Sequence, residues 1–357
     1  MDVGPAVMTP TLLETAMVKT AGALVGAGRG LLAMDESTPT CDRRFAAAGI
    51  PQNVQMRRTY RELLITTHGL ADYVSGAILY DETIRQSDRH GRRLVDRLTD
   101  AGMIPGIKVD TGTTPLALHP GEVITEGLDG LRERLMDYAA MGACFAKWRA
   151  VIGVEDGQPS QACIRANAQT LARYAALCQE AGIVPIVEPE VLMSGAHDMA
   201  RSEEVTGVVL AAVFDELRAQ SIVLEAMILK ANMVLPGLAC TQQDPALALA
   251  TATLRCLRRN VPAAVAGIAF LSGGQASELA SARLNAINAG APGNRSPWPL
   301  VFSFARALQD PALGIWGGKE GNVAAAQQAL LHRARCNYAA LRGVYDDKME
   351  HAALQFA

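Results

Sequence analysis

The sequence predicts an α/β fold in which strands and helices alternate, and three observations support this. Short apolar runs rich in Val, Ile and Leu recur along all 357 residues, each run ends in polar residues, and a segment with helical spacing follows each one. We count eight strand–helix units with a repeat of roughly 35 to 40 residues, the size and number typical of a (β/α)₈ TIM barrel. A doubly wound open sheet is the alternative.

The eight apolar runs are too short for buried helices, and Gly or Pro bounds them, so we interpret each as a strand. They are RGLLAMDES ending near Asp35, SGAILYDET near Asp81, IPGIKVD near Lys108, CFAKWR near Lys147, IVPIVEPE near Glu188, IVLEAMILK near Lys230, AGIAFLSGG near Ser272 and WPLVFSFAR near Arg306.

Helical spacing fills the segments between these runs. Four helices are expected to end at glycines that supply a left-handed cap, namely Gly69, Gly102, Gly142 and Gly182. Further helices are predicted over residues 203–220, 245–259, 276–289 and 320–342. No interdomain linker interrupts the pattern, so residues 1–357 are expected to form a single barrel domain, with a helical lead-in over 1–29 and a C-terminal tail from about 346 to 357.

Composition excludes several classes of function. The formal net charge is −3 and no basic run stands out, so nucleic acid is not an expected partner. The sequence shows neither a signal-peptide pattern nor an apolar stretch long enough for a membrane span, which predicts a soluble cytoplasmic protein without membrane contact.

The seven cysteines are scattered without a CxxC pair, as expected of reduced thiols. The six histidines show no HxxxH spacing, which argues against a catalytic zinc ion. No cofactor and no metal are expected.

Lys230 stands inside the apolar run VLEAMILKANMV, where the only other charge is Glu225. A buried ammonium group must be paired or give up its proton, and a neutral amine is a nucleophile. Alternatively, a lysine at a strand end reaches water while its stem stays buried. The neighbouring strand ends favour the first interpretation.

Those strand ends are rich in ionisable residues. Side chains two apart on a strand share a face, and the active site of a barrel lies at the carboxyl ends of its strands. We therefore expect one cluster at the barrel mouth, although a self-neutralising web of ion pairs is the alternative. Its members would be Asp35, Lys108, Asp110, Lys147, Arg149, Glu188, Glu190, Lys230 and Arg306.

Two groups of residues suggest sites for phosphate. Ser272, Gly273 and Gly274 follow the seventh strand and open a helix, a place where backbone amides bind anions, and Arg306 follows the eighth strand. Arg43 and Arg44, together with Lys108, would hold a second phosphate. Two anion sites beside an amine suggest a bisphosphorylated sugar.

Several motifs, in order, resemble those of the class I fructose-bisphosphate aldolases. They are LLAMDEST, GIKVD, FAKWR, PIVEPE, ILKANMV, FLSGGQ, NAIN, PWPLVFSFARALQ and WGGK, between about Leu24 and Tyr345. The resemblance implies a metal-independent barrel lyase of glycolysis and gluconeogenesis, usually a homotetramer. It would reversibly cleave fructose 1,6-bisphosphate to dihydroxyacetone phosphate and glyceraldehyde 3-phosphate.

The resemblance also implies roles for residues. Lys230 would form the Schiff base, Glu188 would be the principal acid and base, and Asp35, Lys147 and Glu190 would assist. The expected substrate-binding residues are Lys108, Arg149, Ser272, Gly273, Gly274 and Arg306, with Ser37, Thr38, Arg43 and Arg44 around the sixth-carbon phosphate.

Three features depart from the family pattern. Pro39 and Ala305 replace common glycines, and the chain ends HAALQFA without a terminal tyrosine, while Tyr345 lies too early for that role. The alternatives are a transaldolase or another Schiff-base aldolase for a different keto-sugar phosphate, a non-catalytic sugar-phosphate scaffold, and a metal-dependent aldolase.

Overall fold

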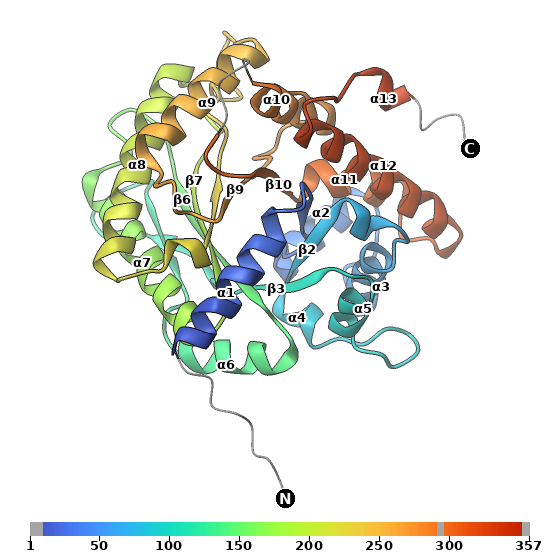
Figure 1. Cartoon of the computed structure of the whole chain (residues 1–357). Helices are drawn as coiled ribbons and strands as arrows, with labels where there is room; N and C mark the ends of the chain where they lie inside the picture. The colour runs from blue at the N-terminus through green and yellow to red at the C-terminus, as the bar shows by residue number, and fades with distance from the viewer. Residues whose placement is uncertain (1–9, 291–295, 352–357) are drawn as a thin grey trace, which may run out of the picture.

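Eight parallel strands close into a barrel, as the sequence predicts (Figure 1). The computed structural model describes residues 10–290 and 296–351. Around the barrel the strands follow the order β1, β10, β9, β8, β7, β6, β3, β2. Their bounds are β1 Gly30–Ala33, β2 Val74–Leu79, β3 Ile104–Lys108, β6 Phe145–Ile152, β7 Val184–Val191, β8 Ile228–Ala231, β9 Gly267–Phe270 and β10 Leu300–Phe304. Each strand overlaps one of the eight predicted runs, although β2, β6, β7 and β8 extend one to three residues beyond theirs.

Helices follow the strands and cover the outside of the barrel (Figure 1). The α-helices are α1 Pro10–Val25, α2 Thr38–Ala47, α3 Val54–Ile65, α4 Asp81–Ile84, α5 Leu94–Asp100, α6 Leu131–Met141, α7 Gln161–Glu180, α8 Met199–Ala219, α9 Ala246–Asn260, α10 Ser277–Ala289, α11 Arg306–Trp316, α12 Val323–Leu341 and α13 Lys348–His351. Short 3₁₀ turns occupy Leu70–Asp72, Leu224–Ala226 and Glu320–Asn322. Among the described residues, no helix is long and apolar enough to cross a membrane.

The predicted glycine caps are found at three of four helices. Gly142 is the C-cap of α6 with φ of 110°, and Gly102 and Gly182 follow the caps of α5 and α7 with positive φ. Gly69 also has positive φ, but α3 already ends at Ile65, and this glycine instead precedes a 3₁₀ turn. Here the expected helix end is four residues too late, because a second turn separates the helix from β2.

Several elements were not predicted, and they include an antiparallel hairpin and helix α11. Strands β4 (Gly112–Pro115) and β5 (Val123–Glu126) form an antiparallel hairpin between β3 and β6, outside the barrel sheet. Asn167 of α7 donates a hydrogen bond to Val123 O at 2.9 Å and so fixes this hairpin against the helical layer. Helix α11 also follows β10 directly, where only the strand was expected.

Helix α1 closes the amino end of the barrel. It contacts β1, β2, β7 and β9, and in Figure 1 it lies across the barrel in blue. The close approach depends on small residues at the strand starts, because a Cβ on Gly267 would lie 2.7 Å from Val25 Cγ2. Leu24 and Val25 join an inner core with side chains such as Phe145 and Ile228. The amino end is therefore packed with apolar side chains, and the opposite end remains for chemistry.

Candidate active site

The inward side chains of the strands change from apolar to ionisable toward the carboxyl end. Residues two apart share a face, so Phe145 of the inner core is followed by Lys147, Ile186 by Glu188, and Ile228 by Lys230. Parallel pairing places these strands side by side, with Arg149 of β6 opposite Glu188 of β7. The predicted gathering at the barrel mouth follows directly from this pattern.

Lys230 and Glu188 form the centre of the cluster. Lys230 is 4% exposed, and its Nζ lies 3.1 Å from Glu188 Oε1. The second carboxylate oxygen of Glu188 is buried and has no hydrogen-bond partner within the described part of the chain. A buried acceptor without a partner is costly unless a ligand or water satisfies it. This oxygen is therefore available to a substrate hydroxyl beside the amine.

Lys147 lies among three carboxylates. Its Nζ is 2.6 Å from Asp35 Oδ2, 3.6 Å from Glu188 Oε2 and 3.8 Å from Asp110 Oδ2. Burial by itself would lower the pKa of Lys147, but the negative charges of these neighbours outweigh burial and raise it. Lys147 therefore stays a cation at neutral pH and serves as the fixed positive charge of the site.

Asp35 is the carboxylate closest to that cation. Burial would raise its pKa, yet the charges of Lys147 and Lys230 outweigh burial and lower the pKa of Asp35 to about 2. Asp35 is thus ionised at neutral pH, which suits it to accept hydrogen bonds from substrate hydroxyls and not to deliver a proton.

Two further cations of the mouth, Arg149 and Lys108, are paired with carboxylates. Arg149 donates from Nε to Glu190, and the negative charge of Glu190 helps to raise the pKa of this guanidinium although burial opposes it. Lys108 Nζ lies 2.6 Å from Asp110 Oδ1. The Arg149 side chain is 41% exposed, so its outer face can still reach a ligand above the barrel.

Ser272, Gly273 and Gly274 form a tight turn between β9 and α10. Both glycines have positive φ, 59° and 93°, which a side chain would disfavour. A Cβ on Gly273 would lie 2.3 Å from Met193 Cε, and a Cβ on Gly274 would lie 3.1 Å from Arg306 Nη2. Arg306 is exposed at the start of α11. The structure thus brings the predicted phosphate turn and the predicted arginine together.

Two residues behind this turn were missed by sequence reasoning. Gln275 donates through its Nε2 to Ser272 O at 2.9 Å, and its Oε1 accepts from Arg283 Nη1 at 2.9 Å. Arg283 is 6% exposed, and burial lowers its pKa. No carboxylate pairs with Arg283 within the described ranges. Arg283 is one of the buried residues of α10 and lies eight residues after Gln275. A basic residue at a buried helix position is the signal that could have revealed it.

The second anion group is only partly open. Ser37 occupies the N-cap position of α2 and donates to Thr40 Oγ1 at 3.2 Å, Thr38 begins the helix, and Arg43 is exposed. Arg44, however, pairs with Glu36 and with Asp310, the latter at 2.8 Å. Arg44 therefore links α2 to α11, while Arg43 is the guanidinium of this group that faces solvent. A phosphate contact by Arg44 stays a prediction.

The mouth as a whole combines a buried amine, a carboxylate in contact with it, a fixed cation and two places for anions. Such a set can form an imine with a phosphorylated ketone and move protons around it. The family model "Fructose-bisphosphate aldolase class-I" matches residues 16–356. The chain belongs to the class I fructose-bisphosphate aldolase family. It is therefore a lyase that cleaves fructose 1,6-bisphosphate.

Relatives of this aldolase come from several kingdoms. The probable fructose-bisphosphate aldolase class 1 of Xylella fastidiosa (strain 9a5c) is 52% identical over 92% of this chain and 97% of its own length. The Arabidopsis thaliana protein fructose-bisphosphate aldolase 4, cytosolic, is 48% identical over 89% of this chain and 80% of its own. The Plasmodium falciparum aldolase, solved with TRAP and a small-molecule inhibitor, has a TM-score of 0.91 and 43% identity, and covers 94% of this chain and 96% of its own.

Both departures from the family's glycines are accommodated in this aldolase. Pro39 lies in the first turn of α2, where a missing amide hydrogen costs nothing. Ala305 is the N-cap of α11 with φ of −101°, outside the left-handed region, so glycine is not required. Of the C-terminal tail, residues 352–357 lie outside the described residues, and Tyr345 donates its hydroxyl to Glu350 at 2.7 Å.

Proposed function

We propose that the reaction proceeds through a Schiff base on Lys230, with Glu188 moving the protons. The observation that carries this proposal is the 3.1 Å contact between Lys230 Nζ and Glu188 Oε1 inside a buried mouth. When Glu188 takes a proton from the ammonium group, the free amine can attack the ketone carbon of the substrate. Glu188 then returns a proton to the carbinolamine oxygen, water leaves, and an iminium forms.

Carbon–carbon cleavage follows from the iminium. A base takes the proton of the fourth-carbon hydroxyl, glyceraldehyde 3-phosphate leaves as an aldehyde, and the bonding electron pair moves to the iminium nitrogen to give an enamine. Protonation of the enamine carbon and hydrolysis release dihydroxyacetone phosphate and restore Lys230. Glu188 would make the proton transfers, while ionised Asp35 and cationic Lys147 would orient the hydroxyls and balance charge, which their close contacts support.

The substrate's two phosphates would bind on opposite sides of Lys230. The first would lie on the Ser272–Gly274 turn beside Arg306, and the second near Ser37, Thr38 and Arg43. Arg149 and Lys108 would contact the sugar. Glu190 would tune the proton transfers near Lys230 and would hold Arg149 in place through their ion pair. The chemistry uses no metal, so a chelator should leave the rate unchanged. Inhibition by a chelator would favour a metal-dependent aldolase.

Borohydride trapping tests the imine directly. With dihydroxyacetone phosphate present, reduction should fix the ligand covalently on Lys230, as read by peptide mass mapping. Lys230→Arg should abolish the adduct, because a guanidinium does not form this imine. Lys319→Arg, at an exposed position outside the mouth, is the control and should keep the adduct. An adduct on a different lysine, or none, would overturn the assignment.

Substrate profiling separates the alternatives. Turnover of a sedoheptulose or tagatose phosphate without cleavage of fructose 1,6-bisphosphate would indicate another keto-sugar phosphate as substrate. Binding without turnover would indicate a scaffold or sensor. We further propose a homotetramer, as the family resemblance implies, and a location in the cytoplasm, by analogy with the relative named cytosolic. Sedimentation should then give four times the chain mass of 37.8 kDa.

A further inference from the structure

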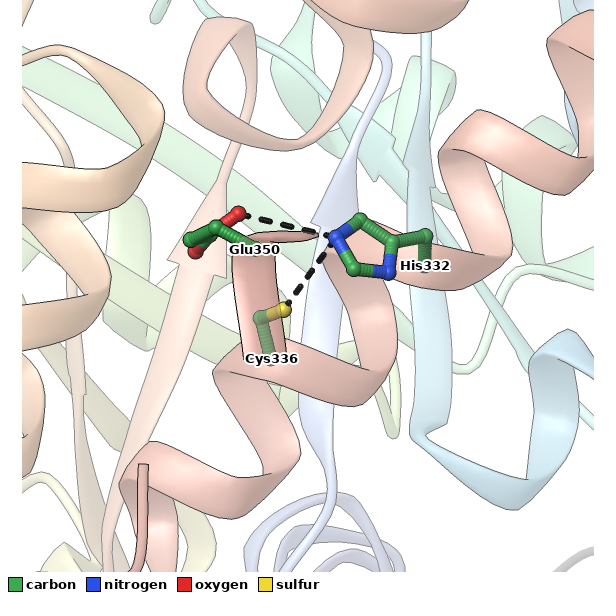
Figure 2. Close-up of side chains that lie close together, drawn as sticks. All are labelled: His332, Cys336 and Glu350. Carbon is green, nitrogen blue, oxygen red and sulfur yellow. Dashed lines mark hydrogen bonds and ion pairs between the residues drawn. The ribbon is translucent and has the colours of Figure 1, made fainter. Parts of the chain in front are cut away.

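A second cluster of reactive side chains joins residues of α12 to a residue of α13, and Figure 2 shows its three members close together. It consists of His332, Cys336 and Glu350. His332 Nε2 lies 3.6 Å from Cys336 Sγ and 3.5 Å from Glu350 Oε2. All three potential ligand atoms lie within 4.8 Å of one another. The aldol reaction gives this cluster no task.

Helix geometry explains how these side chains meet. His332 and Cys336 are four residues apart on α12 and therefore lie on one face of the helix. The chain then turns back, and the Tyr345 backbone amide donates to Asn285 Oδ1 of α10 at 2.9 Å. This bond fixes the connection that carries Glu350 over the face of α12. The sequence search for HxxxH missed the pair because its second member is cysteine.

The separations match those of ligands around one ion. With zinc–nitrogen and zinc–oxygen distances of about 2.1 Å and a zinc–sulfur distance of about 2.3 Å, a tetrahedral ion requires about 3.6 Å between nitrogen and sulfur and about 3.4 Å between nitrogen and oxygen. The observed 3.6 Å and 3.5 Å agree with both values. Imidazole, thiolate and carboxylate are together the donor set of zinc and not of calcium or magnesium.

We propose that His332, Cys336 and Glu350 bind one Zn²⁺ ion, with solvent as the fourth ligand, and that this ion fastens α13 to α12. On binding, the Cys336 thiol loses its proton to solvent as the zinc–sulfur bond forms. Thiolate and carboxylate then offset the two positive charges of the ion, although Arg333 also contacts the Glu350 carboxylate. The His332 and Glu350 side chains are 20% and 15% exposed, which gives the ion a path from solvent.

Neighbouring residues already orient Glu350. Tyr345 donates its hydroxyl to Glu350 Oε1 at 2.7 Å, and Arg333 Nη1 contacts Oε2. Arg333 is itself anchored by Ser277 O at 3.0 Å and Ser281 Oγ at 2.7 Å. Such outer hydrogen bonds hold a ligating carboxylate in place. They also satisfy Glu350 without an ion, so a metal-free clasp between α12 and α13 is the competing state.

Cobalt binding distinguishes the two states without reference to aldolase activity. The full-length protein is freed of metal by dialysis against a chelator and titrated with Co²⁺. One equivalent should produce a near-ultraviolet charge-transfer band from thiolate to cobalt, and Zn²⁺ should abolish the band by displacement. Calorimetric titration with Zn²⁺ should give the same stoichiometry of one ion per chain.

Variants then assign the ligands. Cys336→Ser should remove the band, and His332→Gln and Glu350→Gln should each weaken Zn²⁺ binding at least about tenfold. Cys144→Ser, which removes an exposed thiol, should leave both measurements unchanged. The proposal fails if wild-type protein gives no band, if the band persists in Cys336→Ser, or if neither His332→Gln nor Glu350→Gln changes the affinity. Unaltered circular dichroism of each variant excludes loss of the fold as the cause.

Discussion

Asp35 shows how much a single buried charge depends on its partner. It is 8% exposed, and only the lysines around it keep its pKa near 2. Taking one out of the Asp35–Lys147 pair leaves the other charge desolvated and uncompensated. The ion pair therefore contributes both to the stability of the barrel and to its chemistry. For this reason the sequence alone does not distinguish a catalytic cluster from a web of ion pairs that only neutralise one another.

The lowered pKa of Asp35 predicts a pH dependence of stability. Its folded pKa, about 2, is below the ordinary 3.8, so its contribution is present above about pH 4 and is lost as pH falls toward 2. Asp35→Asn should lower the free energy of unfolding by about 2 kcal/mol at pH 7. In urea titrations the difference from wild type should shrink between about pH 4 and pH 2.

Asp215→Asn provides the reference for this experiment. Its side chain is 74% exposed, and we expect a change below about 0.5 kcal/mol at any pH. A difference for Asp35→Asn that stayed constant from pH 7 to pH 2 would show that the lost contribution is not electrostatic.

At the scale of elements, the turn before α10 has little room for an added side chain. Gly273 combines a left-handed φ of 59° with a van der Waals approach to Met193. Gly273→Ala should therefore displace the backbone amides that we propose bind the first phosphate. We expect KM for fructose 1,6-bisphosphate to rise roughly tenfold with a smaller change in kcat, as measured by steady-state kinetics.

Gly28→Ala is the control that separates the effect of backbone strain from the effect of displacing the turn. Gly28 also has positive φ, 64°, but a Cβ there would meet no atom within 4 Å. Both alanine variants should lose about 1 kcal/mol of stability, and Gly273→Ala alone should change KM. Equal kinetic effects in the two variants would contradict the proposed role of the turn.

Behind the same turn, Arg283 supplies a charge that no carboxylate among the described residues balances. Arg283→Met should raise the inhibition constant of inorganic phosphate about three- to tenfold, because the turn loses both a hydrogen-bonded support and a nearby positive charge. Stability should change little, since the variant also removes a buried unpaired cation. Arg218→Met, at an exposed arginine, is the control. Unchanged phosphate inhibition in Arg283→Met would dismiss this role.

At the scale of the whole molecule, stability and chemistry occupy opposite ends of the barrel. Leu24 of α1 is fully buried at the amino end. Leu24→Ala should cost about 2–5 kcal/mol of unfolding free energy, as measured by urea denaturation, while kcat of the folded fraction remains unchanged. Leu12→Ala, on the same helix but 55% exposed, should have almost no effect. A large fall in kcat for Leu24→Ala would show that the two ends are coupled.

The barrel could be predicted from sequence because its signals are local. An apolar run that ends in a charge marks one strand, and the period of two places Lys147, Glu188 and Lys230 on inner faces without knowledge of their neighbours. Arg44 could not be placed this way, because its partner Asp310 lies 266 residues later in the chain. The β4–β5 hairpin was missed since each of its strands has only 4 residues and neither shows an alternation of buried and exposed side chains.

The division of each strand into an apolar stem and a charged tip has a consequence for how such enzymes diversify. Ile228 and Phe145 pack in the inner core of the barrel. Lys230 and Lys147, the next inward-facing residues on the same strands, lie in the proposed catalytic cluster. Substituting only the residues at the strand ends would change the reaction that the enzyme catalyses and would leave the fold intact. Mutational libraries confined to the final inward position of every strand should accordingly yield many folded proteins and few that retain the ancestral reaction.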